Sequence, residues 1–484
     1  MLNVRFIVKM LGLMLILETL FMLVATGVAF YYGEGDFFPL LLASGTMCSA
    51  GVIAYLAGIN ANEFSAGRRE GMLTVAFIWI VLSFFGMLPF YWGGYIDNVT
   101  DAYFEAMSGF TTTGSTILAD IESLPHGILF WRSLIQWEGG IGVVVFTVAL
   151  MPILGGNAVI MFEEETSGFT HERFRPRVTQ VAKRLWGVYV FLTLCNIGLY
   201  TLGPMNLFDA VCHGLTTIST GGFSTYNDSI GHFDSAYIEW VAIAFMFIGS
   251  LNMSLLYISF NGHPERLWKD EEAHWFAGFV VVASLFIGCW IYFQGYVTDP
   301  TYAIRTSVFQ VVTLISTCGF GTDDYTLWGP FVWLTVMMLM FVCGCAGSTS
   351  GGLKMGRFVI LAKNLSNEFK KQVHPNAIIP VRINGHTLPD SVVHRVLAFV
   401  FAYLTLMVAS CFILTVDGME FMDAISATLT ALSNVGPGLG NLGPADNFAE
   451  VPVISKWFLC FLMMTGRLEV FTVLTILLPG FWKR

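Results

Sequence analysis

Four short segments of this chain share one local pattern, and this fourfold repetition constrains the fold more than any other feature. In each segment a glycine follows two residues, the first of which is Thr or Asn. The position thirteen residues before that glycine is Asp in three segments and Thr in the other. The segments are Thr112-Thr113-Gly114, Thr220-Gly221-Gly222, Thr317-Cys318-Gly319 and Asn434-Val435-Gly436, and the earlier positions are Asp101, Asp209, Thr306 and Asp423.

About ten mostly apolar residues lead from each earlier position to its segment, which as a helix is roughly 15 Å, or half of a bilayer core. We therefore predict four short helices that enter a membrane and turn back, N-capped by Asp101, Asp209, Thr306 and Asp423. The C-terminal end of each helix presents carbonyl groups and the negative end of its dipole. Glycine lets carbonyls point inward where a Cβ would obstruct them. Four such segments around one axis predict the selectivity filter of a cation pore, with the segments themselves as ligands.

Composition places the chain in a membrane. Of 484 residues, 55% are hydrophobic and 12% are charged, and the mean hydropathy is +0.68, whereas soluble domains carry roughly a quarter charged residues. The apolar stretches are long enough for a bilayer core of about 30 Å. The predicted spans are 7–32, 37–60, 70–92, 127–154, 179–203, 237–260, 275–297, 331–360, 393–416 and 453–479.

The basic residues fix the expected orientation. With the N-terminus in the cytoplasm, all but four of the 24 Lys and Arg fall on the inner side, so both termini are expected to be cytoplasmic. Acids favour the outer side, where they would attract cations, although loop polarity alone accounts for this bias equally well. The four exceptions among the basic residues are Arg132, Arg305, Lys456 and Arg467.

The predicted fold class is therefore an all-α integral membrane protein. It has a two-helix hairpin and then four repeats of helix, pore helix and helix around a central pore. The predicted units are the N-terminal hairpin 1–69, pore repeats 70–160 and 161–265, a third repeat 266–365, and a fourth repeat 366–484.

One predicted span cannot be a regular helix. Residues 344–352 contain four glycines and three hydroxyl residues, and each interior glycine costs about 1 kcal/mol relative to alanine. Non-helical backbone at membrane depth must line a cavity, so this segment is expected beneath the filter, where it could obstruct the path. Close helix packing through small residues is the alternative.

Arg467 lies in the middle of the last predicted span. A charge at that depth costs at least about 2.5–3.5 kcal/mol on insertion scales, so the side chain should face the bundle interior or water. Beside a cation path it would raise the barrier to entry. A structural ion pair with Glu469 or Glu138 is the alternative, and Glu18 is a third acid within a span.

The four repeats, each with one filter glycine, resemble the Trk/Ktr/HKT superfamily of potassium translocating subunits, in particular its bacterial TrkH-type members. The resemblance extends over the whole chain and includes Gly344-Cys345-Ala346-Gly347-Ser348-Thr349-Ser350-Gly351-Gly352. It implies that this segment and Arg467 together form a gate on the cytoplasmic side. It also implies a homodimer with two separate pores in the bacterial inner membrane, and a cytosolic nucleotide-binding ring partner, TrkA. Because plant relatives that pass sodium carry Ser at the position of Gly114, the resemblance favours potassium, with rubidium passing too.

A nucleotide site in this chain itself is not expected. The run from Gly347 to Lys354 has Leu353 where a P-loop requires Lys, and no dinucleotide-binding glycine motif opens a helix after a strand. No cofactor other than the transported K⁺ is predicted, and ATP or NAD would act through a partner. That partner would dock on basic linkers at 155–178, 261–274 and 361–392, which could equally serve as orientation signals or bind anionic lipid.

Two other functions remain as alternatives to a gated potassium pathway. An ion-coupled potassium symporter would usually show inverted repeats and matched broken helices, whereas here only the span 331–360 is expected to be broken. An intramembrane enzyme would use His213, Glu138 and Asp209. No nucleophile or metal cluster accompanies them in the sequence, so a packing role for His213 is favoured and no enzyme is predicted.

Overall fold

The computed structural model describes residues 2–61, 67–154 and 178–483, and within these ranges almost all regular structure is helical. The N-terminal half contains α1 (Val4–Tyr32), α2 (Phe37–Ala57), α3 (Arg68–Gly86), α4 (Leu88–Trp92), α5 (Val99–Phe110), α6 (His126–Leu154), α8 (Val178–Thr201), α9 (Leu207–Ile218), η3 (Ser229–Phe233), α10 (Ala236–Gly249), α11 (Met253–Phe260) and α12 (Glu265–Lys269).

The C-terminal half continues in the same manner, with two short strand pairs. It contains α13 (Glu271–Phe293), α14 (Pro300–Ile315), η4 (Tyr325–Trp328), α15 (Pro330–Phe341), β1 (Val342–Cys343), β2 (Leu353–Lys354), α16 (Met355–Val373), β3 (Arg382–Ile383), β4 (His386–Thr387), α17 (Asp390–Val416), α18 (Phe421–Ser433), η5 (Gly440–Leu442), α19 (Val453–Arg467), α20 (Val470–Leu477) and α21 (Pro479–Trp482). Strands β1 and β2 pair in parallel, and β3 and β4 form an antiparallel hairpin.

Five of the described helices are long and apolar enough to cross a membrane, namely α1, α2, α3 continued by α4, α13 and α17. Two bent pairs, α10 with α11 and α19 with α20, also qualify when each pair is taken as one span. The 29-residue α6 and the 24-residue α8 have the length of a span too. The all-α membrane architecture predicted from the sequence is therefore confirmed.

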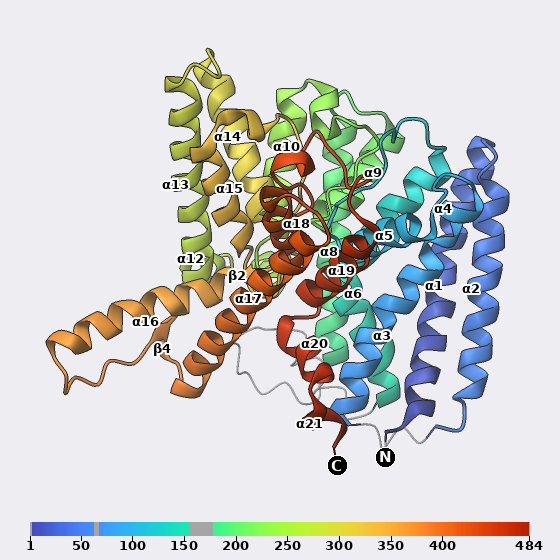
Figure 1. Ribbon diagram of the computed structural model, residues 1–484, viewed down its shortest axis with the longest axis horizontal. Helices are drawn as coiled ribbons and strands as arrows, with labels where there is room; N and C mark the ends of the chain where they lie inside the picture. Colours follow the sequence, from blue (N-terminus) through green and yellow to red (C-terminus); the bar gives the residue numbers. More distant parts are fainter. Residues whose placement is uncertain (1, 62–66, 155–177, 484) are drawn as a thin grey trace.

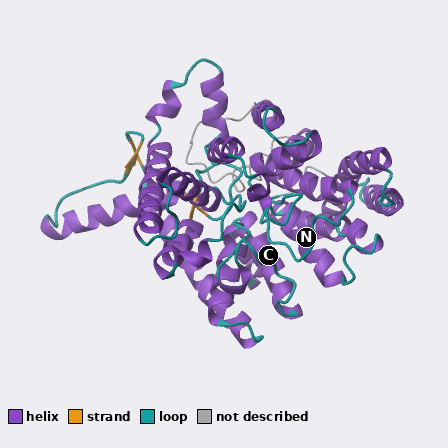
Figure 2. Cartoon of the chain, turned by 90° about the horizontal axis from the view of Figure 1, so that it is seen from above, coloured by secondary structure: helices purple, strands orange, loops and turns teal. Residues whose placement is uncertain are grey.

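The helices close into a ring (Figure 2). One apolar core joins α1–α6 to α17–α20, so the two ends of the chain pack together, and a second core joins α8–α10 to α13–α15. Aromatic side chains of the first and last repeats pack together, with Phe104 against Phe448 and Tyr103 against Trp457. Helix α16 projects away from this body (Figure 1).

The short helices α5, α9, α14 and α18 have 12 to 16 residues, as half-membrane helices require. Their predicted caps were wrong. Asn98, Asn206 and Asp299 accept from the first-turn amides of α5, α9 and α14, and Glu420 precedes α18. The predicted capping residues lie inside the helices, because each helix begins at least one residue earlier than the Asp or Thr. Helix α14 begins earliest, at Pro300.

Three of the four helices that follow a filter segment are interrupted, which corrects the expectation of a single broken span. Helices α10 and α11 meet at 103°, α19 and α20 meet at 119°, and a loop with the β1–β2 pair separates α15 from α16. In the first repeat α6 is one helix through Gly139 and Gly140. Only the glycine-rich break has a clear signal in the sequence, because each of the other two breaks has a single nearby glycine, Gly249 at the end of α10 and Gly466 near the end of α19.

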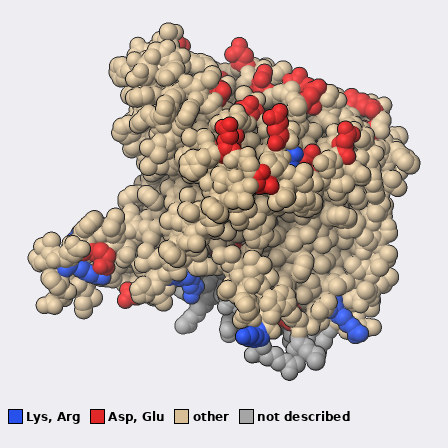
Figure 3. Space-filling view, viewed as in Figure 1, with Lys and Arg blue, Asp and Glu red and all other residues tan. Residues whose placement is uncertain are grey.

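Charge is separated along the long helices. On the visible face acidic side chains gather at one end, while Lys and Arg lie mainly at the other (Figure 3). Both termini lie at the basic end (Figure 1). The predicted linker 155–178 and its arginines, Arg173, Arg175 and Arg177, lie almost wholly outside the described residues, as does the boundary at 160–161.

Candidate functional site: a fourfold ring of glycines and carbonyls

The four aligned glycines form a closed ring. A Cβ on Gly114 would lie 2.3 Å from the carbonyl oxygen of Gly221, and one on Gly222 would lie 1.9 Å from that of Cys318. A Cβ on Gly319 would lie 2.2 Å from the oxygen of Val435, and one on Gly436 would lie 2.8 Å from that of Thr113. Each of these carbonyls belongs to the residue just before the aligned glycine of the next repeat. The glycine of the fourth repeat approaches a carbonyl of the first repeat, which closes the ring. The four segments therefore surround one axis.

The backbone of the ring explains why glycine stands at these positions. The φ angles of the four glycines lie between +78° and +99°, a region that side chains rarely adopt. Two residues earlier, Thr112, Thr220, Thr317 and Asn434 also have positive φ, between 53° and 60°. This second left-handed position was not predicted from the sequence. Asn434 was the available signal, because Asn tolerates that conformation better than most residues.

All predicted filter side chains are buried together at this ring. Those with side chains are Thr112, Thr113, Thr220, Thr317, Cys318, Asn434 and Val435, each exposed by 1% or less. The Asn434 amide donates to Thr113 Oγ1 at 2.9 Å and to the Met463 carbonyl at 2.9 Å, which joins the fourth repeat to the first. The filter backbone is thus fixed by side chains of neighbouring repeats.

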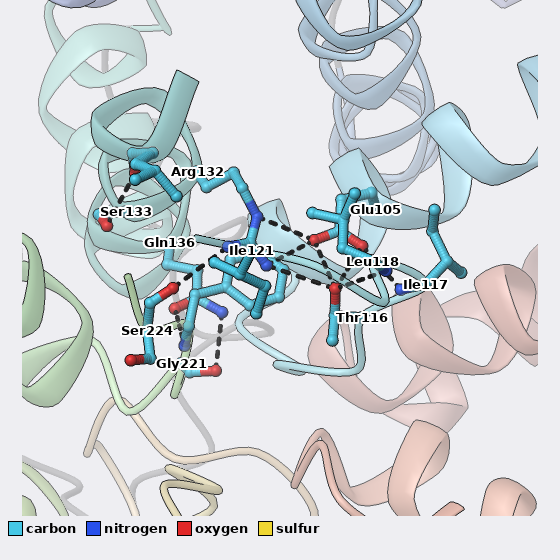
Figure 4. Close-up of polar contacts among 12 residues, drawn as sticks. Glu105, Thr116, Ile117, Leu118, Ile121, Arg132, Ser133, Gln136, Gly221 and Ser224 are labelled. Atoms are coloured by element: carbon cyan, nitrogen blue, oxygen red, sulfur yellow. Dashed lines mark hydrogen bonds and ion pairs between the residues drawn. The ribbon is translucent and has the colours of Figure 1, made fainter. Parts of the chain in front are cut away.

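A buried ion pair supports the ring from the outer side (Figure 4). Arg132 on α6 donates to Glu105 on α5 at 2.7 Å, and both side chains are at most 1% exposed. The Glu105 carboxylate also accepts from the amide of Ile117 at 3.0 Å, and Arg132 donates to the carbonyl of Ser224 at 3.2 Å. This pair therefore ties the chain leaving the first filter segment to the chain leaving the second.

Gln136 braces the second filter segment directly. Its Nε2 donates to the Gly221 carbonyl at 2.7 Å, and its Oε1 accepts from the Phe223 amide at 2.9 Å, so one side chain spans the aligned glycine (Figure 4). Neither Gln136 nor Glu105 was predicted from the sequence as a site residue. A polar residue inside an apolar stretch was the only signal.

The residues predicted as caps fix the outer loops instead. Asp209 accepts from Thr225 Oγ1 at 2.8 Å, and Asp423 accepts from the amide of Asn441 at 3.0 Å. Thr306 donates to Asp323, which belongs to the loop after the third segment. Asp101 pairs with Lys456 of the fourth repeat.

His213 has a structural environment rather than a catalytic one. Its Nδ1 lies 2.8 Å from the Asp209 carbonyl, one turn earlier in α9, and its Nε2 lies 2.9 Å from Ser224 Oγ. The side chain thus links the pore helix to its outgoing loop. Among the described residues no group of three or more His, Cys, Asp or Glu could hold a metal ion.

The glycine-rich segment 344–352 lies directly against the inner ends of the pore helices. Ser350 Oγ donates to the Ser316 carbonyl at 2.8 Å, and the amide of Gly351 donates to Thr317 Oγ1 at 3.0 Å. Thr349 Oγ1 donates to the Ile218 carbonyl at 3.2 Å. The segment therefore satisfies carbonyls at the C-terminal ends of α9 and α14, immediately beneath the filter.

The interrupted helix of the second repeat holds the same segment. The amide of Cys345 donates to the Ser250 carbonyl at 2.9 Å, and the amide of Met253 donates to the Gly347 carbonyl at 3.1 Å. Hydrogen bonds that the α10–α11 break leaves open are therefore completed by the loop, as backbone at membrane depth requires. Within the loop, Gly344 to Gly352 include two residues with positive φ, Gly347 and Gly352.

Arg467 reaches this loop from the end of α19. Its Nη1 donates to the Thr349 carbonyl at 2.7 Å, and its Nη2 donates to the Gly139 carbonyl on α6 at 2.7 Å. The Glu469 carboxylate, named from the sequence as one possible partner of Arg467, binds Arg357 at 2.6 Å. Glu138 lies against Glu18 of α1. Arg467 thus bridges the first, third and fourth repeats at the level of the loop.

Comparison with known proteins places this arrangement in a family. The profile of the TrkH family, described as a cation transport protein, matches residues 47–480. The Trk system potassium uptake protein TrkH of Escherichia coli K12 is 36% identical over 99% of both chains. TrkG of the same organism is 32% identical over 99% of both chains.

A solved structure has the same fold. The crystal structure of the potassium transporter TrkH from Vibrio parahaemolyticus matches with a TM-score of 0.90 and 35% identity, and the match covers 100% of both chains. Full-length identity above 30% and an equivalent fold agree with the fourfold ring described above. The chain therefore belongs to the TrkH family of cation transport proteins and is not an enzyme.

Proposed function

We propose that this chain is a potassium-selective translocating subunit whose filter is the glycine–carbonyl ring. The closed ring of four glycine-to-carbonyl approaches carries this proposal, because rings of backbone carbonyls replace the hydration shell of potassium in selective pores. The relatives named as potassium uptake proteins support the choice of ion. Rubidium, which has the same charge and a similar size, should pass as well.

The proposed gate consists of residues 344–352 and Arg467. Hydroxyl groups of the loop bind the pore-helix carbonyls that would otherwise face a cation, and the guanidinium of Arg467 adds a positive charge at the same level. Opening would require the loop to release these carbonyls and Arg467 to release the Thr349 carbonyl of the loop. A cytosolic nucleotide-binding ring resembling TrkA is proposed to control this step, since the sequence has neither a P-loop motif nor a dinucleotide-binding glycine motif that opens a helix after a strand.

We place the protein in a bacterial inner membrane with both termini in the cytoplasm, as a homodimer with one pore in each protomer. The gathering of Lys and Arg at the end that carries both termini supports this orientation.

The deciding experiment is uptake of radiolabelled rubidium into liposomes that contain this chain alone and are loaded with potassium. Competition by external potassium, and not by excess sodium, is expected. Gly114→Ser should weaken that discrimination, because a Cβ there would displace the Gly221 carbonyl. Absence of uptake, also after Arg467→Ala, would contradict a gated pore.

A potassium symporter coupled to H⁺ or Na⁺ is the second candidate. The observation in its favour is that three inner helices are interrupted at one level, and broken helices form the ion sites of many symporters. Symport predicts that a proton or sodium gradient alone drives rubidium uphill, whereas a pore lets rubidium follow only its own electrochemical gradient.

A further inference from the structure

One carboxylate binds the backbone near both ends of the loop 344–352. Glu272, in the first turn of α13, accepts from the amide of Ala346 at 2.7 Å and from the amide of Gly356 at 2.8 Å, both through Oε1. Ala346 belongs to the loop, and Gly356 is the second residue of α16, just after it. A Cβ on Gly356 would lie 3.0 Å from the carboxylate, so glycine permits this approach.

The two residues before Glu272 bind the cytoplasmic hairpin β3–β4. The amide of Glu271 donates to Asn384 Oδ1 at 2.8 Å, and Asn384 Nδ2 donates to the Asp270 carboxylate at 2.9 Å. Glu271 also pairs with Lys363 on α16, whose ammonium donates to the carbonyl of Arg382 in β3. The linkers 261–274 and 361–392, far apart in sequence, thus meet at the base of the loop.

We propose that Glu272 is a positioning residue that latches the loop 344–352 in its obstructing position, and that Asn384 couples the β3–β4 hairpin to this latch through the first turn of α13. The proposal rests on the gating role proposed above for the loop. One carboxyl oxygen of Glu272 accepts both backbone hydrogen bonds, so a single side chain fixes both sides of a glycine-rich segment. A partner that displaces the hairpin would move α13 and release the loop.

Cys345 is a natural reporter of this latch, because it lies in the loop and is only 2% exposed. The rate at which a soluble methanethiosulfonate modifies Cys345 can be followed by peptide mass spectrometry on the detergent-solubilised full-length chain. Glu272→Ala should raise this rate about tenfold or more, as expected for the loss of two buried hydrogen bonds. Glu272→Gln, which keeps an acceptor oxygen, should stay closer to the wild-type rate.

Asn384→Gly tests the coupling to the hairpin. It removes the side chain but tolerates the φ of +49° at this position, and it should raise Cys345 modification by a smaller factor than Glu272→Ala. An unchanged rate in Glu272→Ala would overturn the latch, and an unchanged rate in Asn384→Gly alone would overturn the coupling.

Rubidium uptake by the same variants separates this proposal from the function proposed above. Faster Cys345 modification with faster uptake supports both. If wild-type protein transports rubidium and Glu272→Ala changes neither rate, only the latch fails. If Cys345 responds as expected but no variant transports rubidium, the latch holds and the gated-pore function fails. If Glu272→Ala does not fold, Gly356→Ala takes its place. Its added Cβ crowds the same carboxylate and should also speed the modification of Cys345.

Discussion

The two sides of the filter are stabilised by different chemistry. On the outer side, away from the loop 344–352, side-chain charges are paired with each other, as in the buried pair of Arg132 with Glu105 and the partly exposed pair of Arg305 with Glu239. On the inner side, hydroxyl groups and the guanidinium of Arg467 bind backbone carbonyls. A buried ion pair is costly to break, because either partner alone is left as an uncompensated charge. Hydrogen bonds to carbonyls can be exchanged for water or a cation. The outer side is therefore suited to keep the filter rigid, and the inner side is suited to a change in the position of the loop.

The four basic residues that departed from the sidedness rule illustrate the same contrast. Three of them, Arg132, Arg305 and Lys456, pair with carboxylates of a pore helix or of a neighbouring repeat on the outer side. The fourth, Arg467, donates to carbonyls on the inner side. Each of these four basic residues thus has a specific partner, and of the four only Arg467 contacts the loop 344–352.

The largest effect is expected on the outer side. Glu105→Ala would leave the Arg132 guanidinium buried without its carboxylate, which should cost about 3–5 kcal/mol of unfolding free energy. The free energy can be measured by denaturant titration in detergent. The double variant Glu105→Ala with Arg132→Met should recover much of this loss. If Glu105→Ala alone is as stable as wild type, the outer side does not depend on this ion pair, and the two sides do not differ as described.

The ring between the two sides should be the next most sensitive region. Gly222→Ala places a Cβ 1.9 Å from the Cys318 carbonyl at a φ of +78°, and backbone strain of this kind costs about 1–3 kcal/mol. We expect lost discrimination between potassium and sodium in the rubidium uptake assay. Gly187→Ala on α8 is the matched control, since a Cβ there meets nothing within 4 Å and should leave uptake unchanged.

On the inner side, substitution should increase activity rather than destabilise the protein. Arg467→Ala removes the charge and both hydrogen bonds at the loop, and we expect rubidium uptake to rise about tenfold, which corresponds to about 1.4 kcal/mol. Arg467→Lys keeps the charge and should remain nearer to wild type. Reduced uptake by Arg467→Ala in protein that is still folded would argue against a gate on this side.

The smallest expected effect tests the corrected caps. Asn98→Ala removes the acceptor of the Thr100 amide at the start of α5 and should cost about 1 kcal/mol of stability. The neighbouring Asp97→Ala should change stability by less than about 0.5 kcal/mol. Equal losses in the two variants would mean that α5 begins at another residue.

Several features could be predicted because they depend on local sequence. Apolar length predicts the spans, and the stretch of about ten residues between a polar start and a filter segment predicts the half-membrane helices. The run Gly344–Gly352 predicts a break, because four glycines in nine residues destabilise a helix. The caps were placed too late because Asn98, Asn206 and Asp299 stand beside other residues that cap equally well, and composition does not choose between them.

The tertiary structure alone decided where the other backbone breaks lie and what they contact. The α10–α11 break exists where Cys345 and Gly347, more than ninety residues later, complete its hydrogen bonds. At the break after α19, Glu469 has a φ of +65°, and its carboxylate is bound by Arg357 of α16, more than a hundred residues earlier. Backbone can leave a helix inside a membrane only where another segment satisfies it. The sequence by itself determined that four glycine segments had to meet around an axis. Which side chains would hold them, and which single arginine would reach the loop, depended on neighbours that only the closed ring brings together.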